Sequence, residues 1–337
     1  MKKYSISNKD MTLFFIVTFG LTISMGIAMA IASSYGFTID TMGNFALIQM
    51  YYPAIGVMIA LLLNSEKRKE LPIKFYMSFL FFTITSIIYF LVSIFVFHKN
   101  TDMGIQYWTI MGSIIVAIMY FTEKKERIDN FGLLGGKNVK KSIGYILLFL
   151  ILYICAILLE SLIFGEFKES IAPFKNLKTL INIFWLPLLF PLSFLAFLGE
   201  EYGWRYFLQT ALQQRIGKRS GVLLLGFIWG IWHLPLNMFL YSPKTSFYSV
   251  LNQLIGCTAY AIFFGFVYMK TENVWTVSII HFLNNSLAFI IYGSTGSNII
   301  LSLQLVLGSL ICMSIVYLPF LFTKEYKKTE VKVNMPT

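Results

Sequence analysis

The residues most suited to chemistry lie in the second half of the sequence, and the first group is a pair of adjacent carboxylates. Residues 199–205 read Gly-Glu-Glu-Tyr-Gly-Trp-Arg, so Glu201 and Arg205 are four residues apart. On a helix this spacing places both side chains on one face, where they can form an ion pair. Glu200 then points about 100° away from that pair and is available for another task.

Two further groups each contain an imidazole. His233 lies in the stretch Trp-Gly-Ile-Trp-His-Leu-Pro (229–235), where a lone histidine could equally be a hydrogen-bonded core residue, and His281 precedes Asn285 by four residues. The second pair therefore shares one face if its segment is helical. The remaining histidine, His98, falls in a loop between apolar segments, so it is not part of this pattern.

These side-chain types suit the hydrolysis of an amide bond. A carboxylate beside an imidazole in a dehydrated pocket can activate water, and a second imidazole with an amide can stabilise the resulting oxyanion. No Ser-His-Asp or Cys-His set competes, because the three cysteines lie inside apolar runs far from these groups. The structural alternative is a set of unrelated polar side chains, each hydrogen-bonded within a helix bundle.

The elements that position these residues are predicted to be membrane-spanning helices. Of the 337 residues, 57% are hydrophobic and only 13% are charged, far below the charged fraction of soluble domains. We therefore expect an all-α polytopic membrane protein with roughly 8–10 transmembrane helices. Apolar segments of sufficient length lie near residues 11–33, 44–63, 76–97, 104–122, 143–164, 178–201, 221–241, 247–269, 274–292 and 299–322.

The distribution of basic residues predicts the orientation of the chain. With a cytoplasmic N-terminus, 22 of the 27 Lys and Arg residues fall in cytoplasmic segments. Such a bias favours cytoplasmic N- and C-termini and an even number of crossings. The net charge of +11 is thus explained by membrane orientation, and we expect a lipid bilayer and no nucleic acid as partner.

Ionisable side chains inside a bilayer are costly, which makes Glu200, His233 and His281 functional candidates. Pro187 and Pro191 should break the early part of the first of these segments, so a regular helix is expected to start after them and to continue inward past Glu200. Three helices would then bring the candidate side chains to overlapping depth. We expect them to surround one wet cavity that opens towards the cytoplasm.

The three groups, in this order on successive late helices, resemble the signature of the CPBP family. That family comprises the type II CAAX prenyl endopeptidases and their bacterial relatives, also called Abi proteins, which are linked to bacteriocin processing or self-immunity. At one position this chain departs from the family pattern, with Trp229 where the family usually has Phe. The resemblance covers about residues 178–292 and is carried by Glu200-Glu201-x-x-x-Arg205, aromatic-x-x-x-His233 and His281-x-x-x-Asn285.

The resemblance implies a catalytic role for four residues. Glu200 would be the base that activates water, with His233 assisting it, while His281 and Asn285 would form the oxyanion site. The residues that would support this geometry are Glu201, Arg205 and Trp229. The resemblance favours a mechanism without a metal or other cofactor. The alternative is a catalytic zinc held by Glu200, His233 and His281, a donor set that would suffice for such a site.

On this interpretation the chain has three parts: variable transmembrane helices (1–177), catalytic core helices (178–292), and a last transmembrane helix with a basic cytoplasmic tail (293–337). The predicted function is a glutamate-dependent intramembrane endopeptidase that faces the cytoplasm. Its substrate would be a membrane-associated protein or peptide, such as a leader peptide, pheromone, bacteriocin or CAAX-like protein. Two alternatives stay open, a non-catalytic scaffold of the same fold that regulates a partner and a proton-coupled transporter. The Lys-, Ile- and Phe-rich composition points to a bacterial cytoplasmic membrane.

Overall fold

The computed structural model describes residues 6–292 and 297–327, and all regular structure in these two ranges is helical. Nine helical segments there are long and apolar enough to cross a membrane. A tenth crossing results if the bent pair Lys218–Trp232 and Leu234–Tyr241 is one span. The predicted all-α polytopic fold is therefore confirmed. The expected basic tail lies largely outside the described residues, because these end at residue 327.

The first half of the chain forms five crossings, one of them interrupted. The long helices here are α1 (Asn8–Ala32), α2 (Ile39–Gln49), α3 (Tyr52–Leu62), α5 (Ile73–Phe95), α6 (Gly104–Phe121) and α8 (Val139–Phe164). Helices α2 and α3 follow each other so closely that they make up one span, Ile39–Leu62. Three short helices lie between or after them: α4 (Ser65–Arg68), α7 (Lys125–Asn130) and α9 (Phe167–Ile171).

The second half holds the elements that carry the candidate residues. They are α10 (Leu177–Trp185), α11 (Phe190–Glu201), the π-helix η3 (Tyr202–Gln209), α12 (Thr210–Ile216), α13 (Lys218–Trp232), α14 (Leu234–Leu236), the π-helix η4 (Asn237–Tyr241), α15 (Ser246–Thr271), α16 (Val274–Tyr292) and α17 (Leu303–Tyr317). Shorter pieces are the 3₁₀ turns η1 (Ala172–Lys175), η2 (Leu186–Leu189), η5 (Pro243–Thr245) and η6 (Leu318–Phe322), and the helix α18 (Lys324–Lys327).

Local sequence explains where several of these helices begin. Ser7 caps α1, since its hydroxyl accepts from the backbone N–H of Asp10 while the Asp10 carboxylate accepts from the N–H of Ser7. Pro53 and Pro191 stand in the first turns of α3 and α11, where the missing N–H of proline has no helical partner to lose. The prediction that a regular helix starts after both Pro187 and Pro191 holds for Pro187 alone, because α11 begins at Phe190 and takes Pro191 into its first turn.

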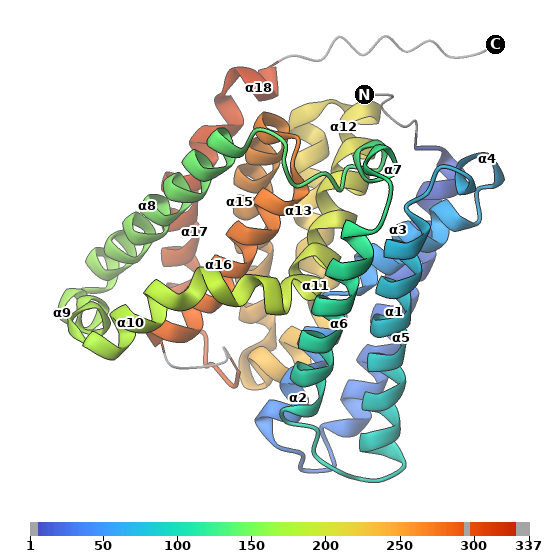
Figure 1. The fold of residues 1–337 in the computed structure, drawn as a ribbon. Helices are drawn as coiled ribbons and strands as arrows, with labels where there is room; N and C mark the ends of the chain where they lie inside the picture. The colour runs from blue at the N-terminus through green and yellow to red at the C-terminus, as the bar shows by residue number, and fades with distance from the viewer. Residues whose placement is uncertain (1–5, 293–296, 328–337) are drawn as a thin grey trace.

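One end of the bundle is defined by contacts between the first and last described segments. Arg215, in the last turn of α12, donates to the backbone oxygen of Ile6 (2.9 Å). Arg219, in the first turn of α13, donates to the backbone oxygen of Leu321 (3.1 Å). We call this end the terminal face; α7, α12 and α18 lie there (Figure 1). The positive-inside bias predicts that it faces the cytoplasm.

The other end joins a second set of loops, and we call it the opposite face. The backbone N–H of Thr38, just before α2, donates to Asn100 in the loop between α5 and α6 (3.0 Å). The N–H of Ile299 donates to the backbone oxygen of Tyr241 (2.8 Å), which fastens the connection from α16 to α17 onto the end of η4. Figure 1 shows α2 reaching this end of the bundle.

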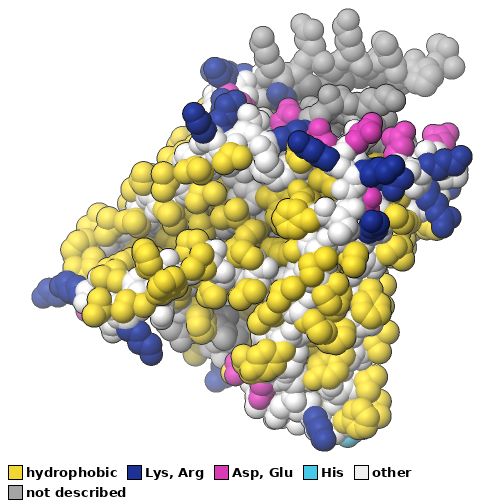
Figure 2. All heavy atoms as spheres, viewed as in Figure 1, with side chains coloured by type: hydrophobic (Ala, Val, Ile, Leu, Met, Phe, Trp, Pro, Cys, Tyr) yellow, Lys and Arg dark blue, Asp and Glu magenta, His cyan; other side chains and the backbone are white. Residues whose placement is uncertain are grey.

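The surface between the two faces is predominantly apolar. In Figure 2, hydrophobic side chains cover the middle of the molecule, while Lys, Arg, Asp and Glu gather towards its two ends. Ile16 on α1, Phe81 on α5 and Leu147 on α8 are among the exposed large side chains of this belt. Such a belt matches a bilayer, because lipid rather than water solvates it.

Candidate active site

The two adjacent glutamates lie at the end of α11, deep in the bundle. Glu200 is 3% exposed and Glu201 is fully buried. The predicted ion pair forms, since Arg205 Nε lies 2.7 Å from Glu201 Oε2. Arg205 itself belongs to the π-helix η3, whose wider turns were not predicted. Such turns are rare and occur frequently at functional sites.

Arg205 is enclosed by aromatic rings as well as by its carboxylate partner. Its guanidinium carbon lies 4.9 Å from the ring centroid of Trp229 and 5.4 Å from that of Phe264. Nη1 and Nη2 have no hydrogen-bond partner among the described residues. The charge is therefore stabilised by Glu201 and by the ring faces, which attract cations.

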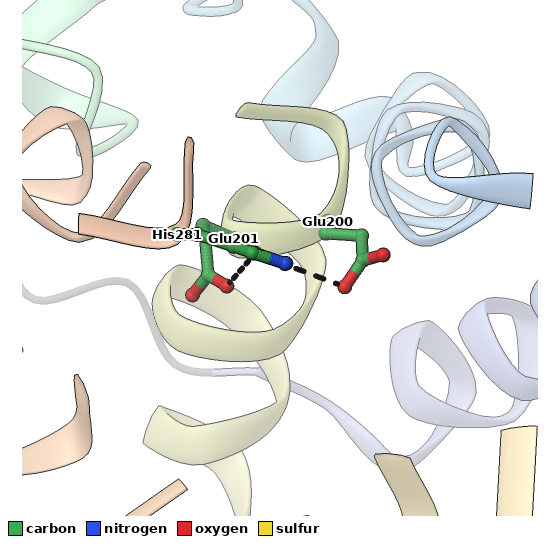
Figure 3. Close-up of side chains that lie close together, drawn as sticks. All are labelled: Glu200, Glu201 and His281. Atoms are coloured by element: carbon green, nitrogen blue, oxygen red, sulfur yellow. Dashed lines mark hydrogen bonds and ion pairs between the residues drawn. The ribbon is translucent and has the colours of Figure 1, made fainter. Parts of the chain in front are cut away.

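His281, on α16, lies between the two carboxylates, as Figure 3 shows. Its Nδ1 is 2.8 Å from Glu201 Oε1 and 4.0 Å from Glu200 Oε2. Since the Glu201 carboxylate can only accept, Nδ1 must carry the proton that it donates. The imidazole is thereby fixed in orientation by a residue 80 positions earlier in the chain, and Nε2 is left for other chemistry.

Glu200 has a different hydrogen-bonding environment from its neighbour. Trp229 Nε1 donates to Glu200 Oε2 (3.0 Å). Among the described residues, this is the hydrogen bond found to the Glu200 carboxylate. Phenylalanine, the usual family residue at this position, has no such donor. The departure noted in the sequence therefore changes how the carboxylate is held as well as the shape of the pocket.

The helix that carries His233 breaks at this residue, which the sequence analysis did not anticipate when it placed one segment over 221–241. Helix α13 ends at Trp232, and the axis bends by 42° before the next helical segment. Pro235 explains the break, because proline cannot donate to a preceding carbonyl and clashes with the preceding turn.

The break frees backbone carbonyls inside the membrane, and side chains satisfy them. His233 Nδ1 donates to the backbone oxygen of Trp229 (2.8 Å), so Nε2 is the nitrogen that can accept. Gln49 Nε2, from the end of α2, donates to the backbone oxygen of Trp232 (2.8 Å). The backbone oxygen of His233 keeps a backbone partner, the N–H of Asn237 (3.0 Å), and Asn237 Nδ2 donates to it as well (2.9 Å). An unpaired carbonyl here would cost several kcal/mol, so these side chains make the break possible.

A cavity of about 760 Å³ brings most of the predicted site residues together. It is lined by Glu200, Trp229, His233, His281 and Asn285. Glu201 and Arg205 do not line the cavity and lie behind its wall. Glu200 and His233 both line the cavity but are not hydrogen-bonded to each other. Trp229 links them, because its ring N–H donates to Glu200 and its backbone oxygen accepts from His233.

The expectation that this cavity opens on the same side as the termini is wrong. Its lining includes Asp40 at the start of α2, Tyr241 at the end of η4, and Ile299 and Leu301 before α17. All four belong to the opposite face, and the described lining contains no residue of the terminal-face loops. The prediction rested on the depths of the side chains, and these do not reveal the direction in which packed helices leave space.

The N-terminal helices also contribute to the site, which was not predicted from the sequence. Residues of α2 and the start of α6, among them Asn44 and Gln106, form one wall of the cavity. Gln49, which supports the break in α13, lies in an apolar segment where an amide is unusual. That position could have been recognised from the sequence, but only ionisable residues were considered.

The metal ligands suggested by the sequence are not the group that the fold assembles. Among the described residues, the potential ligand atoms that lie within 4.8 Å of one another belong to Glu200, Glu201 and His281, without His233. Both oxygens of Glu201 already accept hydrogen bonds, and His281 Nδ1 donates one of them. A nitrogen that donates a proton cannot ligate a metal. As arranged, Glu201 and His281 Nδ1 are engaged with each other, which leaves Glu200 and His281 Nε2 as the ligand atoms of this group that a metal ion could use.

The fold and the cavity define a polytopic membrane protein with buried carboxylates and imidazoles at a solvent-accessible site. Residues 182–287 match the family model described as "Type II CAAX prenyl endopeptidase Rce1-like". This match confirms, over residues 182–287, the resemblance carried by the motifs. No curated protein and no solved structure gives a match to the chain.

Proposed function

We propose that the protein is an intramembrane endopeptidase in which Glu200 activates the attacking water. The observation that carries this proposal is the position of Glu200, buried in the bundle yet lining the cavity with two imidazoles and an amide. One Glu200 oxygen is oriented by Trp229, so the carboxylate retains acceptor sites for a water molecule. Glu200 would take a proton from this water as hydroxide adds to the peptide carbonyl, and would pass the proton to the leaving amine.

His233 is suited to orient the same water. Its Nδ1–H is held by the backbone oxygen of Trp229, which leaves a lone pair on Nε2. A water placed between Glu200 and this nitrogen would be held by two acceptors. The role is that of an assisting group, because the net proton transfer is complete with Glu200 alone.

The oxyanion that forms on the peptide carbonyl needs hydrogen-bond donors. Asn285 lines the cavity one helical turn from His281 and offers an amide N–H. For His281 to donate as well, the imidazole must carry protons at both nitrogens, Nδ1 for Glu201 and Nε2 for the oxyanion. The two flanking carboxylates favour such a cation, since opposite charges nearby stabilise it.

The pair of Glu201 and Arg205 would hold this arrangement in place. Glu201 contacts both His281 and Arg205 and does not line the cavity, so it acts through the imidazole. In this mechanism the chain's own side chains perform every proton transfer, and we propose that the reaction proceeds without a metal ion.

The proposal is tested by comparing new protein N-termini in membranes that contain the wild type, Glu200→Gln or Glu160→Gln. Glu160→Gln is the control, because it makes the same chemical change at an exposed position of α8 that does not line the cavity. We expect Glu200→Gln to lower cleavage by about 10²–10⁴-fold, the usual contribution of a general base, and Glu160→Gln to have no effect. The same N-termini at the same abundance with Glu200→Gln would overturn the proposal and favour a non-catalytic scaffold.

A further inference from the structure

We infer that the cavity receives its substrate from the membrane face opposite to the termini, as an internal stretch of peptide rather than a chain end with a free carboxylate. This inference rests on the proposed peptidase function and adds the side of access and the class of substrate. It is carried by two independent features of the cavity, the position of its mouth and the charges of its lining.

The position of the mouth follows from the loops that border it. Asp40 follows the connection from α1 to α2, and that connection is fastened to the loop between α5 and α6. Ser242 and Ile299 border the mouth from the other side, where Ser242 donates to the backbone oxygen of Ile299 (2.5 Å). Both connections lie at the opposite face, whereas most basic residues lie at the terminal face. Because the positive-inside rule assigns the terminal face to the cytoplasm, the mouth faces away from it.

The charges of the lining disfavour a terminal carboxylate. Among the described lining residues two are acidic, Asp40 and Glu200, and none is Lys or Arg, while the imidazolium that the proposed mechanism places at His281 is already paired between Glu200 and Glu201. The guanidinium of Arg205 lies behind the rings of Trp229 and Phe264 and is paired with Glu201. Proteins that capture a carboxylate normally present a guanidinium or an ammonium to it, so a free chain end would enter this cavity against like charge.

The rest of the lining suits the backbone of a peptide. Asn44, Gln106, Asn252 and Gln253 line the cavity among apolar and aromatic side chains; the Asn44 amide is already paired with Thr101 and Gln106, and the other three supply the amide groups for a ligand. Amides can both donate to and accept from peptide groups, which must stay hydrogen-bonded once they leave water. The volume of about 760 Å³ lies in the ordinary range of sites that enclose a small ligand, so it can hold a short peptide segment.

The first experiment determines the side of access and does not depend on catalysis. In a chain whose three native cysteines are replaced, Asp40→Cys reports on the mouth and Lys125→Cys, on α7, reports on the terminal face. Both positions are exposed. We expect a membrane-impermeant maleimide to label Asp40→Cys in intact cells and Lys125→Cys only after permeabilisation. The reverse pattern would overturn the inferred side of access.

The second experiment tests the substrate class with purified protein in detergent micelles. Two pools of N-acetylated, internally quenched apolar peptides are identical except that one ends in a carboxamide and the other in a free carboxylate. We expect the amidated pool to be cut roughly tenfold faster, which corresponds to about 1.4 kcal/mol. Cleavage confined to the last few residues of the free-acid pool would overturn the proposal.

A matched variant assigns the preference to the charge at the mouth. Asp40→Lys replaces an exposed carboxylate with a cation and should narrow the difference between the two pools, whereas the same substitution at the distant, exposed Glu126 should not. An unchanged ratio with Asp40→Lys would contradict the charge argument. If neither pool is cut by the wild type, the peptide part of this inference fails together with the proposed function, and the labelling result still decides the side of access.

Discussion

Two buried polar clusters lie in different parts of the bundle, and they differ in how completely their carboxylates are paired. In the N-terminal cluster, Asp10 accepts hydrogen bonds from Ser7 N (3.0 Å), Asn64 Nδ2 (3.1 Å) and Lys67 Nζ (2.6 Å). In the active-site cluster, Glu201 is comparably enclosed by Arg205 and His281. Its neighbour Glu200 accepts from Trp229 and faces a cavity instead.

The difference indicates which carboxylate is available for reaction. A carboxylate has room for about four hydrogen bonds, and a buried carboxylate with a donor on each oxygen is a structural element. Asp10 and Glu201 are of this kind, with three and two such bonds respectively, whereas Glu200 accepts one and keeps acceptor capacity on a solvent-accessible wall. In the proposed mechanism, these adjacent residues of one helix have separate tasks: Glu201 fixes the geometry and Glu200 contacts the substrate.

The largest effect on stability is expected from breaking the buried ion pair of Glu201 and Arg205. Arg205→Met leaves Glu201 buried without its cation, which should lower the free energy of unfolding by about 3–5 kcal/mol. Thermal unfolding in detergent measures this loss. The double variant Arg205→Met/Glu201→Gln should recover part of it, since it removes the uncompensated charge. A single variant as stable as the wild type would show that the pair has no structural role.

The second prediction concerns the hydrogen bond from Trp229 that orients Glu200. Trp229→Phe retains an aromatic ring but removes the donor to Glu200, and a hydrogen bond to a charged group contributes about 1.5–3 kcal/mol. We expect kcat to fall roughly tenfold to hundredfold with KM nearly unchanged, because orientation of Glu200 rather than binding is lost. Trp185→Phe, at an exposed position on α10, is the control. A rise in KM at constant kcat would instead indicate a binding role.

A smaller effect is expected in the N-terminal cluster. Lys67→Met removes one of the donors to Asp10 and should lower the free energy of unfolding by about 1–2 kcal/mol, because a buried acceptor loses a partner close to the aqueous edge. The cleavage rate of the folded protein should not change. The exposed neighbour Lys69→Met is the matched control. Loss of activity at unchanged stability would mean that the two clusters are coupled.

The smallest effect concerns Asp102, in the loop near the mouth of the cavity. Hydrogen bonds from the hydroxyls of Thr38 and Thr41 lower the pKa of this carboxyl below its ordinary value of 3.8. A lowered pKa stabilises the fold above pH 3.8, and this contribution is lost as the pH falls through the folded value. Asp102→Asn should therefore increase hydrogen exchange at the start of α2 near neutral pH, with the difference disappearing in acid. A difference that persists in acid would contradict this.

The features that the sequence predicted are those that depend on local patterns. The membrane spans follow from the length of apolar runs, and α8 and α16 lie close to the expected 143–164 and 274–292. The pair of Glu201 and Arg205 follows from helical spacing and forms although the π-helix changes the local turn. The expected catalytic roles of Glu200, His233, His281 and Asn285 stay predictions, now with a cavity that contains all four.

The features that were missed depend on contacts between distant segments. The bond from His281 to Glu201 and the bond from Gln49 to Trp232 join helices that are far apart in the sequence. No periodicity within one helix encodes such a partner. The break at His233 is a different case, because Pro235 was visible in the sequence and was not used. The direction of the cavity depends on the packing of whole helices, so side-chain depth alone could not give it.

The close approach between α11 and the junction of α2 and α3 has a consequence for how the protein can vary. A methyl group added at Gly199 would lie 2.6 Å from the backbone oxygen of Met50, and one at Gly203 would overlap Pro53. Residues 182–287 therefore contact the N-terminal helices through glycine backbone, with no side chain, at both positions. The N-terminal helices can be exchanged between proteins only if the incoming segment tolerates the same close backbone contact with Gly199 and Gly203.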